Sequence, residues 1–242
     1  MAGVMIALTL GPCCFGALFA GEPIMFVTFM QIPLYLFSMT LAAYKLNAML
    51  ISTMRAEREN AFHARHDMLT GLSNRAGLTR AFATRFGSDA APQGLALIYL
   101  DLDGFKAVND TYGHPAGDAL LQLVAERLRA LVRSSDIAAR IGGDEFVVLS
   151  EQTERVQLQR IGERLVKDIS EPYELDSGHR LHIGASVGIA LAPEHGTDMN
   201  AVMAAADAAL YQAKSRGKSL CVIAAQRAVI DGQASTGPRL LH

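Results

Sequence analysis

The order of apolar runs and turns after Gly94 constrains the fold of this chain more than any other feature. Leu95 to Leu100 is a continuous apolar run, which predicts a buried strand at 95–101. Hydrophobic spacing and turn residues then predict, in chain order, helices at about 105–112 and 116–133, strands at 137–141 and 145–150, a helix at 154–171 and a strand at 181–192. This βαββαβ order predicts an α+β domain with a ferredoxin-like sheet.

Two acidic turns are expected to meet at one edge of this sheet. The first, Asp101-Leu102-Asp103, follows the strand at 95–101, and the second, Gly142-Gly143-Asp144-Glu145, precedes the strand at 145–150. A ferredoxin-like sheet places its first and third strands side by side and antiparallel, so the end of one lies beside the start of the other. Asp101 and Asp144 therefore converge in the predicted fold.

The second turn has the composition of a phosphate and metal site. Gly142 and Gly143 lack a Cβ atom, so the backbone can take positive φ and let a triphosphate approach closely. Asp144 and Glu145 offer hard oxygen ligands to a divalent cation. Gly-Gly between two apolar runs is also a generic hairpin signal, and the turn alone leaves that interpretation open.

The segment between the two acidic turns is rich in polar residues and glycines. An amide at Asn109 and a carboxylate at Asp118 could read the edge of a guanine base. Lys106 follows the first acidic turn and could meet a triphosphate as a point charge. Asp118 has a simpler interpretation as the N-cap of the amphipathic helix that follows.

The N-terminal part of the chain, 1–44, is predicted to be a membrane region. Hydrophobic residues make up 50% of the chain and the mean hydropathy is +0.21, with the apolar excess before Lys45. Residues 24–44 carry no charge and are long enough to cross about 30 Å of hydrocarbon. Residues 1–20 are also uncharged, so a helical hairpin of two spans is predicted, with Pro33 as a candidate kink. Basic residues after the second span place the downstream chain in the cytoplasm.

Residues 45–66 are predicted to form a connecting helix, because they lack glycine and proline and their apolar residues recur at roughly helical spacing. This helix is either a solvated spacer or one strand of a parallel two-helix coil, and we favour the coil. A globular domain is expected over 67–225, which is long enough to bury a full core. A disordered tail is expected at 226–242.

Composition also bears on partners and redox chemistry. The net charge is −2 and no basic block is interleaved with aromatic residues, which argues against nucleic-acid binding. Cys13 and Cys14 lie in the first apolar run and Cys221 in an expected late strand, so no disulfide framework is implied.

Four blocks of the sequence occur together in one known family. They are His66 to Arg75, Asp101 to Asp118, Gly142 to Phe146 and Ala206 to Lys214. In this order and spacing they resemble the GGDEF domains of bacterial diguanylate cyclases, over about His66 to Ile223. The resemblance implies a GGDEF or palm-type fold. It also implies a bacterial enzyme that condenses two GTP molecules into cyclic di-GMP and two pyrophosphates, at the two-fold interface of a homodimer. Together with the apolar N-terminal runs, this predicts a location at the bacterial inner membrane.

The resemblance further implies roles for single residues. Two Mg²⁺ or Mn²⁺ ions per subunit would be held by Asp101, the Leu102 carbonyl, Asp144 and Glu145. Asp144 is assigned as the catalytic base, with Glu145 and Lys106 in support. The substrate would be bound by the following residues: Asn109, His114, Asp118, Gly142, Gly143, Lys214 and Lys218.

The segment Arg133-Ser134-Ser135-Asp136 resembles the inhibitory RxxD site that captures the product in many of these enzymes. Feedback inhibition is therefore predicted, with Arg164 as a second arginine of the site. An arginine can grip phosphate and stack on a guanine face. Arg133 has a simpler interpretation as a basic residue that complements the dipole of a helix C-terminus.

Two other classes of function stay open on the sequence alone. A non-catalytic receptor could bind GTP or cyclic di-GMP and signal through its conformation. A different nucleotide cyclase or a palm-type polymerase would share the paired acidic turns but lack Asn109, Asp118 and the RxxD segment. The intact acidic motifs favour catalysis.

Overall fold

The computed structural model describes residues 15, 23–86, 94–175 and 178–226. The chain divides into two compact units, Met1–Asn60 and Ala61–His242. Most of the tail predicted at 226–242 lies outside the described residues.

Helix α2, Pro23–His63, dominates the described part of the first unit and continues unbroken through Pro33. Among the described residues, one stretch, Gln31–Arg55, is long and apolar enough to cross a membrane by its length and composition. The span predicted at 24–44 and the connecting helix predicted at 45–66 are thus parts of one helix, which ends at His63. The first predicted span, 1–20, lies outside the described residues except for Phe15.

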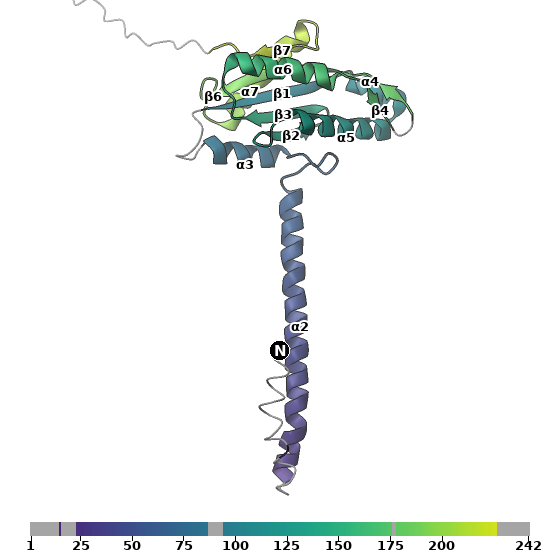
Figure 1. Ribbon diagram of the computed structural model, residues 1–242, viewed down its shortest axis with the longest axis vertical. Helices are drawn as coiled ribbons and strands as arrows, with labels where there is room; N and C mark the ends of the chain where they lie inside the picture. The colour runs from purple at the N-terminus through teal and green to yellow at the C-terminus, as the bar shows by residue number, and fades with distance from the viewer. Residues whose placement is uncertain (1–14, 16–22, 87–93, 176–177, 227–242) are drawn as a thin grey trace, which may run out of the picture. The chain divides into compact units, whose positions relative to one another are not determined.

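The second unit is built on a mixed five-stranded sheet with the order β2-β3-β1-β6-β7 (Figure 1). All neighbouring pairs are antiparallel except β6 and β7, which are parallel. The apolar run at the start of β1 explains its central position, since both faces of the strand must be buried. The bounds are β1 Leu95–Asp103, β2 Ile137–Gly142, β3 Glu145–Ser150, β6 Gly184–Ala192 and β7 Cys221–Ile223.

Helices cover both faces of the sheet. The even-numbered side chains of β1, such as Ile98 and Leu100, pack against α4 (Phe105–Tyr112), α5 (His114–Leu131) and α6 (Arg155–Ile169). The odd-numbered ones, such as Leu97 and Tyr99, pack against α3 (Arg75–Phe86) and α7 (Met199–Ser215). Because successive side chains of a strand point to opposite faces, β1 contributes to two hydrophobic cores.

The predicted βαββαβ order and the antiparallel pairing of the first and third strands are confirmed. Several boundaries differ by one to three residues: β1 extends to Asp103 and β2 to Gly142, α5 spans His114–Leu131, α6 spans Arg155–Ile169, and the last long strand begins at Gly184. A short hairpin of β4 (Tyr173–Glu174) and β5 (Arg180–Leu181) precedes that strand. Helices α3 and α7 are additions to the predicted set of elements.

Candidate active site

The two acidic turns meet at the end of β1. Asp101 lies directly across from Glu145 in the ladder between β1 and β3. The Leu102 N–H donates a hydrogen bond of 3.3 Å to the Asp144 carbonyl oxygen. The structure therefore brings the backbones of the four predicted metal ligands together, and three of them, Asp101, Leu102 and Asp144, line one cavity that Glu145 does not line.

The carboxylates of these turns lie in a mostly buried setting. Asp101 is only 9% exposed, and its Oδ2 lies 2.7 Å from the Lys214 Nζ. Burial and the neighbouring Asp101 charge raise the pKa of Asp144, although Lys214 and Arg140 act in the opposite direction. The two neighbouring carboxylates have one ammonium group, that of Lys214, beside them, so a further positive charge would stabilise them.

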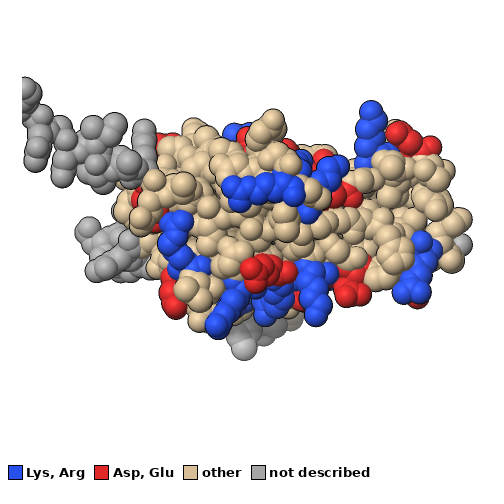
Figure 2. Space-filling model, turned by 90° about the horizontal axis from the view of Figure 1, so that it is seen from above, with Lys and Arg blue, Asp and Glu red and all other residues tan. Residues whose placement is uncertain are grey.

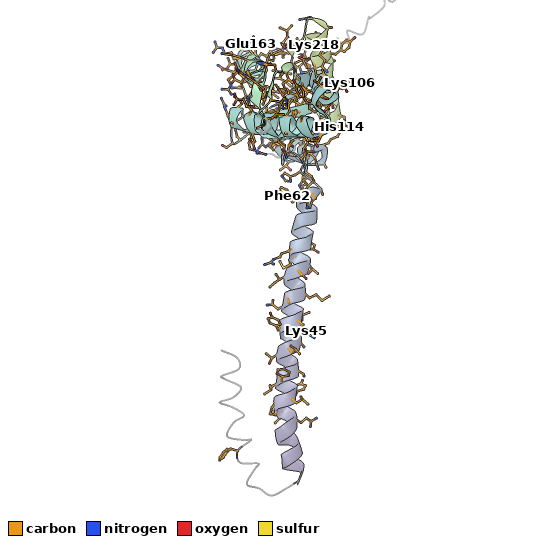
Figure 3. All side chains as sticks on the ribbon, turned by 90° about the vertical axis from the view of Figure 1, so that its right-hand side faces the viewer. Lys45, Phe62, Lys106, His114, Glu163 and Lys218 are labelled. Carbon is orange, nitrogen blue, oxygen red and sulfur yellow. The ribbon has the colours of Figure 1, made fainter. Side chains whose placement is uncertain are left out.

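A cavity of about 440 Å³ opens at this edge of the sheet. Carboxylates and ammonium groups line it together: Asp101, Asp103, Asp110 and Asp144, with Lys106, Lys214 and Lys218. Figure 3 labels Lys106 and Lys218, both toward the right-hand side of the domain, with Glu163 toward the left. Lysines of α4, of α7 and of the turn after α7 thus line one cavity. Several lysines at one cavity are expected of a binding site for a polyanion.

The Gly142-Gly143 turn is held by a single guanidinium group. The Arg140 Nε and one terminal nitrogen donate hydrogen bonds of 3.0 and 2.8 Å to the Gly143 carbonyl. The other terminal nitrogen contacts both oxygens of Asp67, at 3.1 and 3.2 Å. Gly143 has a φ of +50°, and an added Cβ would meet nothing within 4 Å at either glycine, so the backbone of the turn is open to a ligand.

Asp67 is itself fixed by its surroundings. Its Oδ1 accepts hydrogen bonds from the Thr70 N–H at 3.0 Å and the Thr70 hydroxyl at 2.6 Å. Burial raises the pKa of Asp67, but the hydrogen bonds from Thr70 and the charged Arg140 outweigh this and hold the pKa below its usual value. The block His66 to Arg75 is therefore tied to the Gly-Gly turn through Arg140.

We expect Arg140→Ala to lower the free energy of unfolding by about 1.5–3 kcal/mol, because it removes charge-assisted hydrogen bonds to Gly143 and Asp67. Urea denaturation followed by circular dichroism measures this loss. The matched control is Arg80→Ala, which removes an exposed arginine from α3 and should stay within about 0.5 kcal/mol of the parent. Equal stability of the two variants would contradict the proposed tie.

Glu145 contacts the buried side chain of Tyr99. Tyr99 is 6% exposed, and its hydroxyl is hydrogen-bonded to the Glu145 side chain. Burial, the Glu145 charge and this hydrogen bond raise the pKa of Tyr99. The predicted site residues did not include Tyr99, which reads in the sequence as one more apolar position of β1.

The nominated guanine-binding residues lie where α4 meets α5. Asn109 belongs to α4, whereas His114 and Asp118 are exposed near the start of α5. Among the described residues, the Asn109 Oδ1 is one of three buried side-chain oxygen or nitrogen atoms without a hydrogen-bond partner. A buried polar atom of this kind needs an explanation, and a ligand that donates to it is one. A Cβ at Gly117 would lie 1.9 Å from this oxygen, so the glycine keeps the space for the amide.

Arg133, Asp136 and Arg164 also come together, at a second cavity of about 360 Å³. The Arg133 N–H donates a hydrogen bond of 3.0 Å to the Asp136 Oδ2, which shapes the loop between α5 and β2. Arg164, which lies on α6, donates a hydrogen bond of 2.7 Å to the Leu131 carbonyl at the end of α5. Arg160 lines the same cavity and was not among the predicted residues, although its spacing of four from Arg164 on one helix could have revealed it.

Metal binding is not built into the side chains alone. Within the described ranges, no group of three or more His, Cys, Asp or Glu side chains is placed to hold a metal ion. The predicted ligands also include the main-chain carbonyl of Leu102, a residue at the end of β1 that lines the cavity.

Comparisons with known proteins agree with this geometry. Residues 64–220 match the family described as "Diguanylate cyclase, GGDEF domain". The bifunctional diguanylate cyclase/cyclic di-GMP phosphodiesterase MucR of Pseudomonas aeruginosa is 48% identical over 172 residues, which are 69% of this chain. That match spans only 24% of the length of MucR.

Two solved structures resemble the domain. The GGDEF domain of TpbB (YfiN) from Pseudomonas aeruginosa has a TM-score of 0.62 and 35% identity, and the match covers 66% of this chain and 94% of that one. The coiled coil and GGDEF domain of DgcB from Caulobacter crescentus, in complex with c-di-GMP, has a TM-score of 0.69 and 26% identity, covering 77% of this chain and 100% of that one. By its motifs, its fold and the family match over residues 64–220, this chain belongs to the GGDEF-domain family of diguanylate cyclases.

Proposed function

We propose that this chain condenses two GTP molecules into cyclic di-GMP and releases two pyrophosphates. In each of two steps the 3′-oxygen of one GTP bonds to the α-phosphorus of the other and loses its proton. The bond from that phosphorus to the bridging oxygen breaks, and pyrophosphate leaves with the electron pair. The observation that carries the proposal is the cavity that gathers Asp101 and Asp144 with Lys106, Lys214 and Lys218.

Two Mg²⁺ or Mn²⁺ ions per subunit belong to this proposal, held by Asp101, the Leu102 carbonyl, Asp144 and Glu145. The residues fit such ions, because the charge of Asp101 and partial burial raise the pKa of Asp144 even with Lys214 nearby, so further positive charge would stabilise the two carboxylates. When bound, the ions would neutralise phosphate charge and lower the pKa of the attacking hydroxyl.

The chain's own side chains have separate tasks in the proposal. Lys106 stabilises charge on the reacting phosphates, and Lys214 and Lys218 hold the terminal phosphates. Asp144 accepts the proton of the 3′-hydroxyl, supported by Glu145. The open backbone at Gly142 and Gly143 lets the nucleotide approach.

Guanine would be selected between α4 and α5. The unpartnered Asn109 Oδ1 accepts from the base, and the exposed Asp118 carboxylate binds its ring N–H and exocyclic amine, with His114 nearby. This arrangement explains why an amide oxygen stays buried without a partner.

We expect Gly117→Ala to raise the KM for GTP about 10-fold, because the new Cβ displaces the Asn109 amide, which is the flexible end of its side chain. The melting temperature should be unchanged or higher, since alanine favours the helical interior. Initial rates over a range of GTP concentrations measure the KM. In an Asn109→Ala background the same substitution should alter the KM less than about twofold, and an undiminished effect there would contradict the mechanism.

The proposed enzyme acts as a homodimer, because one subunit holds one of the two GTP molecules. Helix α2 carries exposed apolar side chains such as Leu46, Met49, Leu50 and Met54, which suit either lipid or a second copy of the helix. The DgcB structure that matches 77% of this chain contains a coiled coil, which supports the same arrangement here. We place the chain at the bacterial inner membrane, with the catalytic domain in the cytoplasm.

Nucleotides rather than nucleic acids are the expected partners. On the face shown in Figure 2, basic and acidic side chains are interspersed. This face lacks the unbroken positive stripe with which proteins track a phosphate backbone.

Product inhibition completes the proposal, with cyclic di-GMP bound at the cavity of Arg133, Asp136 and Arg164. The guanidinium groups would contact phosphate and guanine faces, and Asp136 would pair with a guanine edge.

The direct test is to incubate the full chain, purified in detergent, with GTP and Mg²⁺ and to separate the nucleotides by chromatography. We expect cyclic di-GMP and pyrophosphate in a ratio of one to two, and no product from ATP. GTP that binds but is not consumed would instead identify a receptor.

A further inference from the structure

The turn between α7 and β7 has an unusual backbone. Three consecutive residues have positive φ values, namely +124° at Gly217, +65° at Lys218 and +50° at Ser219. Residues with a Cβ rarely adopt this conformation, because it costs conformational energy that the surroundings must offset. The turn carries Lys218 to the cavity.

Two polar side chains of the sheet hold this turn. The Ser219 N–H lies 3.1 Å from both the Asp103 Oδ2 and the Ser186 Oγ. The Ser186 hydroxyl donates a hydrogen bond of 2.7 Å to the same Asp103 oxygen. Ser186 is fully buried on β6, so its hydroxyl is fixed by the core around it. Three segments far apart in the sequence thus meet at one carboxylate oxygen.

The space beside this network is closed. A Cβ at Gly184 would lie 2.7 Å from the Ser219 Oγ and 3.1 Å from the Asp103 Cβ. Gly184 pairs directly with Asp103 across β1 and β6. The missing side chain therefore lets the turn come close enough to bond to the strand.

Asp103 lines the cavity but is not among the residues proposed to hold a metal ion, so its carboxylate has no assigned task there. Its Oδ1 is buried without a hydrogen-bond partner among the described residues, so Oδ2 alone anchors the side chain. The hydrogen bonds from Ser186 and Ser219 give the Asp103 carboxylate a structural role that does not require contact with phosphate.

We infer that Asp103 and Ser186 are positioning residues for Lys218: they fix the turn 217–219 in its strained conformation so that the Lys218 ammonium group reaches the phosphates of GTP. The inference rests on the proposed function and adds to it two residues that do not touch the substrate. Ser186 acts through Lys218, so its contribution depends on the presence of that lysine.

The test is a double-mutant cycle with two readouts. Calorimetric titration with GTP, in EDTA so that the proposed reaction does not proceed, should show a Kd about 5- to 30-fold higher in Ser186→Ala than in the parent. In a Lys218→Ala background the same substitution should change the Kd less than about twofold. Hydrogen exchange measured by mass spectrometry should be about tenfold faster at the Ser219 amide in Ser186→Ala.

The matched control is Ser215→Ala, which removes an exposed hydroxyl at the end of α7 that bonds to the Gln212 carbonyl. Its Kd and its Ser219 exchange should equal those of the parent. Unchanged exchange in Ser186→Ala, or an equal loss of affinity with and without Lys218, would overturn the inference. A parent chain that binds no GTP would refute the proposed function, whereas the exchange experiment would still decide whether Ser186 holds the turn.

Discussion

Asp144→Asn is expected to lower the rate of cyclic di-GMP formation about 10²- to 10⁴-fold. The substitution keeps the size of the side chain but removes a metal-binding oxygen and the proposed proton acceptor. Initial rates from chromatography of the GTP reaction measure the loss. The fold should survive, because the turn is held by Arg140 and by the Leu102 N–H, which bonds to the main-chain carbonyl of residue 144.

Stability separates this loss from simple unfolding. The pKa of Asp144 is raised by burial and by Asp101, which means that the folded state holds the proton more tightly than the unfolded state does. The ionised carboxylate therefore destabilises the fold at neutral pH, and the neutral amide of the variant removes that penalty. In EDTA, the melting temperature of Asp144→Asn should equal or exceed that of the parent.

The control for this prediction is Glu126→Gln, which neutralises an exposed carboxylate on α5. It should retain the parental rate within about twofold. An Asp144→Asn protein that keeps more than about a tenth of the parental rate would rule out the proposed role.

Arg133→Ala should weaken cyclic di-GMP binding about 10- to 100-fold, because a guanidinium that grips phosphate contributes charge-assisted hydrogen bonds. Turnover without added product should remain at the parental value, since Arg133 lines the second cavity and not the one at the end of β1. The inhibition constant is obtained from initial rates at increasing cyclic di-GMP, and calorimetry gives the affinity directly.

Lys167→Ala serves as the matched control, because it removes an exposed positive charge from α6 without altering the lining of that cavity. Its inhibition constant should equal that of the parent. Equal inhibition in Arg133→Ala and the parent would show that product is captured elsewhere.

Local patterns in the sequence were sufficient to predict four of the five strands of the sheet and their order. The apolar run before Asp101 and the Gly-Gly turn identify β1 and β3, and the βαββαβ order then determines which strands are neighbours. Helix α7 was missed because its alanine-rich sequence shows little contrast between its faces. The short parallel strand β7 joins the edge of the sheet beside β6, which a pattern of local periodicity does not reveal.

The sequence predicts those residues of the site that belong to short recognisable motifs. Asp101, Asp144, Lys106 and Lys214 reach the same cavity as the motifs imply, whereas their functional roles stay predictions. The hydrogen bonds that support the site cannot be predicted from local motifs, because their partners are far apart in the sequence. Ser219 bonds to Asp103 from 116 positions away, and neither residue alone indicates a partner.

The attachment of Asp67 to Gly143 through Arg140 bears on the engineering of chimaeras. The Asn74 side chain adds bonds to the Ala64 and His66 carbonyls, and the rings of Phe62 and His66 stack at 4.0 Å. A fusion junction placed between Phe62 and Asn74 would disrupt the contacts that position Asp67, and with them the Arg140 hydrogen bonds that hold the Gly142-Gly143 turn. A foreign input module should therefore be joined upstream of Phe62, so that the GGDEF domain keeps residues 62–74 and their contacts intact.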